Sequence, residues 1–139
     1  LFKSKKYYPQ IMSVKSTADN FTIKKGKNVI QLKSLNVKHG NVNTRGYLFK
    51  NIAYISDCKT IPKKTLLKLK NLDFLVLDCF RKTEHATHLN LNNSIDLVKY
   101  LKPKKAILTN LHVELDYNKI KKILPKNTIP AYDGLKINF

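Results

Sequence analysis

The sequence predicts one layered α/β domain, and three features of its 139 residues carry that prediction. The first part of the chain contains segments in which apolar and polar side chains alternate, as is typical of half-buried antiparallel strands. The second part contains short continuous apolar runs, which indicate buried strands, between segments of helical periodicity. The length suffices for one domain with its own core. Strands followed by a strand–helix alternation favour helices packed on a sheet.

Two hairpins are expected in the first part. Residues 21–25 and 28–37 alternate well enough to be strands, and Gly26 lies in the turn between them. Residues 47–51 and 52–56 form the second pair, with the turn where the two segments meet. These segments predict the antiparallel part of the sheet.

A short helix and a buried strand should follow the hairpins. The helix is expected over residues 60–70, with Thr60 as its N-cap and Pro62 early in its first turn. The strand is expected over residues 73–79 because this run is short and apolar and contains the β-branched Val76. Its length separates it from a helix.

The best helix is predicted over residues 90–101. Leu91, Ile95 and Val98 form an apolar stripe at spacings of four and three, and Pro103 stops the helix. The stripe should face the sheet.

The end of the chain repeats the strand–helix pattern. A buried strand is expected over residues 105–110, and Asp116 can cap a short helix over residues 117–124. A turn at Asp133–Gly134 should precede a final strand. Antiparallel strands followed by strands that alternate with helices predict a layered α/β domain.

The composition limits the classes of function. Of 27 basic residues only Arg45 and Arg81 are arginines, which leaves 27 − 2 = 25 lysines spread over a chain of net charge +18. Sites that bind phosphate through two parallel hydrogen bonds favour arginine over lysine. The scattered lysines therefore indicate diffuse surface charge more than a dedicated nucleic-acid-binding face. No apolar run approaches the roughly 18 residues of a membrane span, and the first residues lack the apolar core of a signal peptide. A cytoplasmic location is the default, and Cys58 and Cys79 are expected to be reduced and buried.

Residues with metal-binding or proton-transfer chemistry follow several predicted strands. They are His39, Asp57, Asp78 and His112, with His85 and His88 in the connection before the best helix. Loops from neighbouring strand ends converge in α/β folds, and histidine with carboxylate suits zinc, manganese or iron. Single residues of this kind are also common as surface or turn residues. Both interpretations stay open at this point.

At these residues the sequence resembles the metallo-β-lactamase-fold hydrolases. Within them it is most similar to the phosphodiesterase of the carbon–phosphorus lyase pathway and its relatives, with tRNase Z as a more distant relative. The matching segments cover about residues 35–139 and are "KHGNVNTRGYLF", "AYISDCKTIP", "LDFLVLDCFRKTEHATHLNLNNSIDLVKYLKPKKAILTN", "ELDY" and "AYDGL". The resemblance implies that the chain forms the C-terminal half of an αββα sandwich.

The resemblance also implies roles for individual residues. His39 corresponds to a metal ligand and Asp57 to a carboxylate that bridges two ions, whose positive charge would offset the desolvation of the carboxylate. His88 corresponds to a histidine beside the ions that assists proton transfer; a plain contact at the helix start is the alternative. His85 suits a supporting or exposed role.

The sequence departs from the family pattern in two places. The family's "HxHxDH" motif is absent, so we expect it in an N-terminal half upstream of Leu1, unless catalysis has been lost. Relatives usually carry histidine after the threonine of "LTNLHVELDY", where this chain has Asn110. We predict that His112 takes this ligand role; a structural zinc site is the alternative.

The resemblance implies a dinuclear-metal phosphodiesterase, inactive as this chain alone. The expected cofactors are two divalent ions, zinc or manganese, and the expected substrates are small cyclic phosphodiesters or nucleotide-like esters. Arg45 and Arg81 are candidates for orienting the anion. The alternatives are an RNA-processing nuclease like tRNase Z, which the net charge favours, or an inactive nucleic-acid-binding module. Nucleic acid and a second copy of the chain in a homodimer stay open as partners, and no membrane partner is expected.

Overall fold

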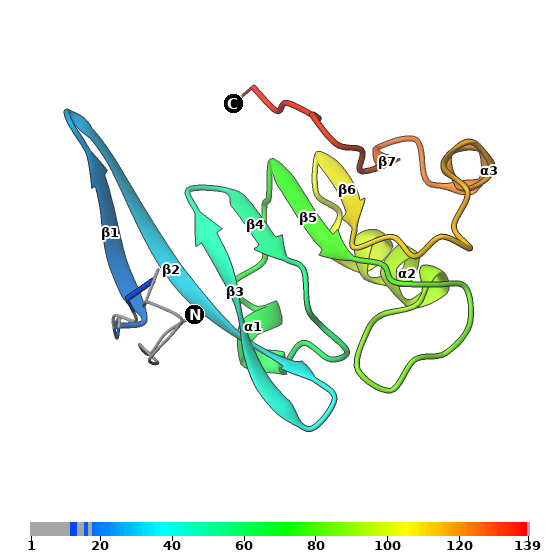
Figure 1. Cartoon of the computed structure of the whole chain (residues 1–139), viewed down its shortest axis with the longest axis horizontal. Coiled ribbons are helices and arrows are strands. Elements are labelled where there is room, and N and C mark those ends of the chain that lie inside the picture. Colours follow the sequence, from blue (N-terminus) through cyan, green and yellow to red (C-terminus); the bar gives the residue numbers. More distant parts are fainter. Residues whose placement is uncertain (1–11, 14–15, 17, 139) are drawn as a thin grey trace, which may run out of the picture.

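Seven strands form one sheet in which the spatial order is the chain order (Figure 1). The computed structural model describes residues 12–13, 16 and 18–138. The strands are β1 (Asn20–Lys25), β2 (Asn28–His39), β3 (Val42–Phe49), β4 (Ile52–Ile55), β5 (Phe74–Asp78), β6 (Lys105–Thr109) and β7 (Thr128–Pro130). The helices are α1 (Lys63–Leu66), α2 (Leu91–Leu101) and α3 (Tyr117–Ile123). None of the helices in this described part is long and apolar enough to cross a membrane.

The direction of the strands decides where functional side chains can meet. Strands β1 to β4 pair antiparallel, whereas β4 to β7 pair parallel through connections that contain α1, α2 and α3. Because β2 and β4 are both antiparallel to β3, they run in the same direction as β5 and β6. The carboxyl ends of these four strands therefore lie at one edge of the sheet, where ligand sites of α/β folds are usually built.

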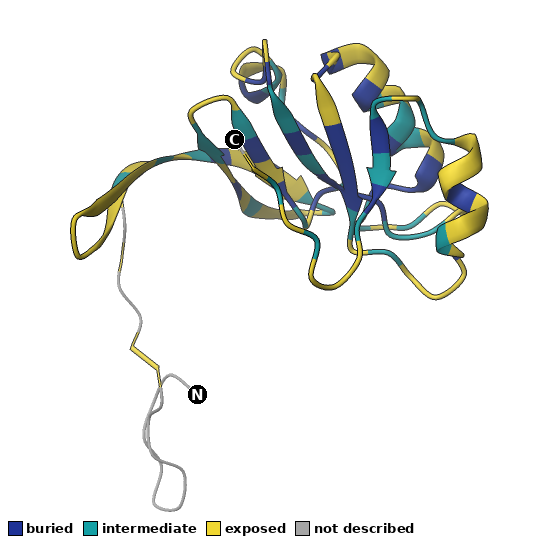
Figure 2. Ribbon diagram, turned by 90° about the horizontal axis from the view of Figure 1, so that it is seen from above, coloured by how far each residue is buried: buried dark blue, intermediate teal, exposed yellow. Residues whose placement is uncertain are grey.

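The core lies on one face of the sheet. The strand register places the side chains of the core residues on the same face. Helix α1 packs against β2, and helix α2 packs against β5. The central core residues are Leu35, Val37, Ala53, Ile55, Leu75, Leu77, Ala106 and Leu108. The β1–β2 hairpin projects from this body and is largely exposed, whereas buried residues concentrate in β5 and β6 and their helices (Figure 2).

The predicted turns and the predicted Asp116 cap are confirmed, whereas the cap of α2 by Asn90 was not predicted. The β3–β4 turn contains Lys50, which takes a left-handed φ of 50°. Asn90 caps α2 by accepting a 2.8 Å hydrogen bond from the Asn93 N–H, and Asp116 caps α3 by accepting one from Lys119 N–H. Helix α2 ends before Pro103, as its sequence pattern predicts.

Two element predictions are wrong. The helix expected over residues 60–70 is only the four-residue α1, because Thr60 exchanges backbone hydrogen bonds with Lys38 beside β2 instead of capping. The last strand is β7, which precedes the Asp133 turn, while residues 135–138 form no strand. Three residues that include Pro130 carry too little periodicity to reveal a strand, and parallel pairing with β6 creates it.

Cys58 and Cys79 are buried and free, as predicted. Burial, with a smaller contribution from the Asp78 charge, raises the pKa of the Cys58 thiol to about 12. Burial likewise raises the pKa of the Cys79 thiol to about 11. Both side chains therefore stay protonated at neutral pH and pack as small apolar groups.

Candidate functional site

Four strand ends deliver polar side chains to the same edge of the sheet. His39 is the last residue of β2 and Asp78 is the last residue of β5. Asp57 lies two residues beyond β4, and Asn110 follows β6 directly. The connection between β5 and α2 adds His88. The convergence of strand ends predicted from the sequence is therefore present.

The segment after β4 is fastened beside the end of β2. The Lys38 N–H donates to the Thr60 carbonyl at 2.9 Å, and the Thr60 N–H donates to the Lys38 carbonyl at 3.1 Å. The Thr44 hydroxyl donates to the Asp57 carbonyl at 2.9 Å. These bonds bring the Asp57 backbone next to His39, although the two residues lie 57 − 39 = 18 positions apart in the sequence.

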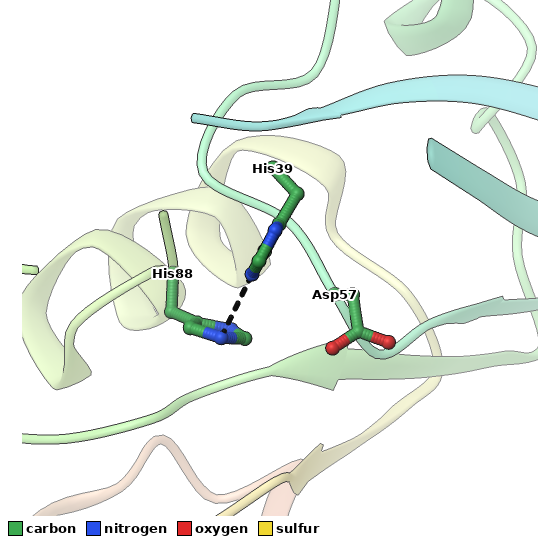
Figure 3. A group of neighbouring side chains, drawn as sticks. All are labelled: His39, Asp57 and His88. Atoms are coloured by element: carbon green, nitrogen blue, oxygen red, sulfur yellow. Dashed lines mark hydrogen bonds between the residues drawn. The ribbon is translucent and has the colours of Figure 1, made fainter. Parts of the chain in front are cut away.

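His39, Asp57 and His88 form a group in which one ligand atom from each lies within 4.8 Å of the others. The two imidazoles point toward one another, with 2.9 Å between the Nε2 atoms, and Asp57 lies beside them (Figure 3). Both histidines are half-buried, whereas Asp57 is exposed and accepts a 3.1 Å hydrogen bond from the Ser56 hydroxyl. The group therefore opens to solvent on the side of its carboxylate.

The donor set of this group fits a divalent ion. Imidazole nitrogen and carboxylate oxygen are the ligands that zinc and manganese accept. Two imidazole nitrogens bound to one tetrahedral zinc ion would lie about 3.3 Å apart. The observed 2.9 Å is instead a hydrogen-bond distance between the two Nε2 atoms. A small separation of the two rings makes room for an ion.

Asp78 is the buried carboxylate of the site, and its role was missed in the sequence. Its side chain is 0% exposed. Oδ2 accepts hydrogen bonds from the Cys58 N–H at 3.0 Å and the Leu89 N–H at 3.4 Å, and it lies 2.8 Å from His88 Nδ1. Oδ1 accepts a 3.0 Å hydrogen bond from the Asn110 amide. The sequence signal was the aspartate that ends the apolar run "FLVLD", the same signal that drew attention to Asp57.

The contact with Asp78 orients His88. A carboxylate on one imidazole nitrogen fixes the ring and directs the other nitrogen outward, as second partners of metal-site and catalytic histidines commonly do. Here Nδ1 faces Asp78 and Nε2 faces His39. The carboxylate also stabilises the ring when it carries a positive charge. His88 therefore presents one nitrogen, Nε2, for chemistry at the mouth of the site.

The loop that carries His88 is closed at its base. Phe80 N–H donates to the Leu89 carbonyl at 2.9 Å, and the Leu89 N–H donates to the Cys58 carbonyl at 2.8 Å. Farther out, Glu84 accepts a 2.7 Å hydrogen bond from the Asn90 amide and forms an ion pair with Lys59. These contacts hold the loop over the buried carboxylate and limit the freedom of the imidazole.

The remaining histidines gather around one phenylalanine. The Phe80 ring centroid lies 4.9 Å from that of His85, 4.8 Å from that of His88 and 5.3 Å from that of His112. Partial burial, followed by the positive charge of Arg81, lowers the pKa of His85. His85 is therefore neutral near pH 7, and its Nδ1 accepts a 3.3 Å hydrogen bond from the Thr87 N–H.

His112 does not belong to the group formed by His39, Asp57 and His88. Its ring packs on Phe80, and its Nδ1 accepts a 3.4 Å hydrogen bond from the Glu114 N–H. Asn110 points into the site in its place. The structure thus brings two of the three predicted ligands together, with His88 as the third member, and a ligand role for His112 stays a prediction.

The two arginines proposed for substrate binding lie in different surroundings. Arg45 forms a 2.9 Å ion pair with Asp19 and a hydrogen bond with Asn36 on the middle of the sheet. Arg81 lies in the loop of His85, where its guanidinium donates to the Glu84 carbonyl at 2.9 Å. Arg81 lies in the same loop as His85 and His88, between β5 and α2, whereas Arg45 lies in β3. Binding of substrate by either residue stays a prediction.

The beta-lactamase superfamily domain matches residues 4–110 of the chain. The chain belongs to this superfamily. Its mixed sheet with helices on one face corresponds to a fragment of the metallo-β-lactamase fold, which confirms the predicted fold class. The predicted resemblance to metallo-β-lactamase-fold hydrolases is likewise confirmed.

Solved structures give the same fold. The chain is 32% identical to a diphosphatase of the PhnP family, with a TM-score of 0.79 over 86% of this chain and 46% of that one. It is 15% identical to the short form of human tRNase Z, with a TM-score of 0.59 over 86% and 47% of the two chains. A metallo-beta-lactamase fold protein of Bacillus subtilis is 15% identical, with a TM-score of 0.63 over 86% and 52%. The last two likenesses show the fold alone.

The chain is shorter than all of these relatives. It spans about half the length of the three solved structures. An octanoyltransferase of Porphyromonas gingivalis is 26% identical over 110 residues, which are 77% of this chain and 22% of that protein. The relatives therefore contain further residues that this chain does not match.

Proposed function

We propose that this chain forms the C-terminal half of a metal-dependent phosphodiesterase that acts on small cyclic phosphodiesters or nucleotide-like esters. The observation that carries the proposal is the convergence of His39, Asp57 and His88 at one sheet edge, with Asp78 behind His88. Likeness to the PhnP-family diphosphatase supports a phosphate-containing substrate. The net charge of +18 suits an anionic substrate.

Each side chain of the site has a distinct task in this proposal. His39 and Asp57 would hold the ions, zinc or manganese, through an imidazole nitrogen and a carboxylate. His112 is proposed as a further ligand. The ions supply positive charge that offsets the charge growing on the phosphoryl oxygens in the transition state. Arg45 and Arg81 are proposed to orient the substrate anion.

His88 handles the proton. It carries a proton on Nε2 and gives it to the oxygen of the leaving group, while Asp78 holds the ring through Nδ1 and stabilises its positive charge. Such a general acid contributes most when the leaving group is poor. The half-buried position of His88 limits its exchange with bulk water.

A chimera tests the proposal. The part of the PhnP-family diphosphatase that this chain does not match is joined to the chain, and hydrolysis of bis(p-nitrophenyl) phosphate and of a 2′,3′-cyclic nucleotide is measured. We expect turnover that requires manganese or zinc and is abolished by Asp57→Ala. The 139-residue chain alone should show no turnover, because the group found in its described part contains only two of the proposed metal ligands, His39 and Asp57.

A matched aspartate controls for general damage. Asp73 precedes β5 and pairs with Lys104 on the surface, so Asp73→Ala should leave turnover unchanged. Circular dichroism of each variant confirms that the chimera is folded. Turnover that survives Asp57→Ala, or that needs no metal in the presence of a chelator, would contradict the proposed role of the site.

RNA processing is the second candidate function. The net charge of +18 and the fold shared with tRNase Z favour it. Cleavage of a precursor tRNA in preference to the cyclic nucleotide would support this candidate. A module that binds nucleic acid without turnover is the third candidate. It is favoured by Asn110, which stands where relatives usually carry a histidine. Salt-dependent RNA binding without metal-dependent hydrolysis identifies that module.

A further inference from the structure

Asn110 has three polar neighbours at the site. Its side-chain nitrogen Nδ2 lies 3.0 Å from Asp78 Oδ1, 3.3 Å from His88 Nδ1 and 3.4 Å from the Ser56 carbonyl oxygen. The Asp78 and Ser56 oxygens are acceptors, so the NH₂ group of the amide has to face them. The orientation of the amide is therefore fixed by its surroundings.

The backbone suits asparagine at this position. Asn110 has a φ of 62°, in the left-handed region that asparagine adopts more readily than most residues other than glycine. This conformation turns the chain immediately after β6. The turn keeps the short amide side chain over Asp78.

Two arrangements of protons are compatible with the heavy atoms. In the first, His88 Nδ1 carries a proton and donates to Asp78 Oδ2, while Asn110 donates to Asp78 Oδ1. In the second, His88 Nδ1 is bare and accepts a hydrogen bond from the Asn110 amide. In the first arrangement Nε2 of the neutral ring faces His39 with a free electron pair, and in the second Nε2 carries the proton.

The surroundings of Asp78 favour the first arrangement. A bare Nδ1 would place its electron pair 2.8 Å from Oδ2, which already accepts from the Cys58 N–H. Two acceptors at that distance repel unless the carboxyl group carries a proton between them. The shorter contact of the amide is also the one to Asp78, at 3.0 Å against 3.3 Å to His88. The geometry therefore assigns both hydrogen bonds to the carboxylate.

We propose that Asn110 is a positioning residue: its amide anchors Asp78 Oδ1 and keeps Oδ2 aligned with His88 Nδ1, so that the ring proton lies on Nδ1 and Nε2 faces the site. Asn110 is the partner that holds Oδ1, whereas the other hydrogen-bond partners of the Asp78 carboxylate all lie on Oδ2 in the described part of the chain. Asn110 acts through Asp78 and does not itself touch the reacting atoms.

The inference gives a reason for asparagine at the end of β6, and it deepens the proposed function on which it rests. In that function His88 has to hold and release a proton at Nε2. A ring fixed with its other proton on Nδ1 does this without rotating. The assignment of the proton is independent of metal and substrate, so it can be tested on the chain as it is.

Nitrogen NMR of the 139-residue chain tests the proposal. The protein is labelled with ¹⁵N-histidine and kept free of metal by a chelator, and long-range proton–nitrogen correlations assign the protonated nitrogen of each neutral ring. His88→Gln identifies the His88 signals. We expect a protonated Nδ1 and a bare Nε2 for His88. A bare Nδ1 with a protonated Nε2 would overturn the proposal without any further variant.

Asn110→Gly tests the contribution of the amide itself. Glycine keeps the left-handed backbone without strain, so the variant removes only the side chain. We expect the ratio of the two neutral forms of His88 to shift about fivefold toward the form protonated on Nε2, the size of one hydrogen bond. Asn71→Gly is the matched control, since Asn71 is exposed and has a φ of 55° in another loop.

The outcomes separate this inference from the proposed function. A shift in Asn110→Gly but not in Asn71→Gly supports the positioning role. An unchanged His88 ratio in a folded Asn110→Gly protein contradicts it, even if the chimera hydrolyses phosphodiesters. Conversely, the expected NMR result with an inactive chimera would leave Asn110 in its role and count against the proposed hydrolase.

Discussion

Asp78→Asn should lower the free energy of unfolding by about 1–3 kcal/mol, the cost of leaving a buried hydrogen-bond donor without its acceptor. The variant keeps the size of the side chain, so no cavity contributes. In the unaltered chain the Asp78 carboxylate is surrounded by the Cys58 N–H, His88 Nδ1 and the Asn110 amide. The NH₂ group of the new asparagine has to face one of these groups, which then loses its hydrogen-bond acceptor. Urea unfolding followed by circular dichroism measures the loss.

Asp73→Asn is the matched control at the other end of β5. Asp73 pairs with Lys104 at 2.7 Å, and the Lys104 side chain is 80% exposed. Hydrogen bonding from Lys104 lowers the pKa of Asp73. Its contribution is therefore present above the pKa of the unfolded chain and fades as the pH falls through the lowered pKa. Because exposed pairs contribute little, we expect a far smaller loss, and equal losses for the two variants would contradict the account of Asp78.

His88→Ala should lower turnover of the chimera by about 10²–10⁴-fold while its metal content stays unchanged. The substrate for this measurement is a phosphodiester with a poor leaving group, because such a group needs the proton most. An activated leaving group such as p-nitrophenolate should hide much of the defect. Steady-state rates and elemental analysis of the same protein samples give the two quantities.

His85→Ala controls for changes in the loop that both histidines share. His85 contacts Phe80 and His88 but lies outside the metal-binding group, so its loss should reduce turnover much less. Loss of metal together with activity in His88→Ala would show that His88 is a ligand. Unchanged turnover in His88→Ala would mean that another group supplies the proton.

The sequence predicted the parts of the fold that depend on neighbouring residues. The apolar stripe of Leu91, Ile95 and Val98 predicted α2, and Asp116 predicted the start of α3. The convergence of strand ends followed from the order of the elements. By contrast, β7 has only three residues and exists through its pairing with β6, which no local pattern encodes.

The missed part of the site depends on contacts between distant segments. Asp57 and Asp78 both end apolar runs, yet Asp57 is exposed and Asp78 is fully buried. The difference arises because the loop that carries His88 and Leu89 folds over Asp78. That closure involves a backbone hydrogen bond to Cys58, some thirty residues earlier, and it cannot be inferred from either segment alone.

The surroundings of Asn110 and His112 also depend on contacts between distant segments, and a ligand role for His112 stays a prediction. Histidine is the better metal ligand, so the sequence favoured His112. The left-handed turn at Asn110 instead keeps the amide over Asp78, and His112 packs on Phe80. Asparagine after a strand was a signal for such a turn.

Paramagnetic broadening by manganese tests most directly whether the sheet edge binds a divalent ion. It detects weak binding and reports its location, so it suits a chain that supplies few ligands. Backbone amide signals of the ¹⁵N-labelled chain are recorded with small additions of Mn²⁺, for the unaltered chain and for His39→Ala and Asp57→Ala. The account predicts that broadening begins around His39, Asp57 and His88 and is lost in both variants. Broadening centred elsewhere, or broadening at this edge that persists in both variants, would contradict it.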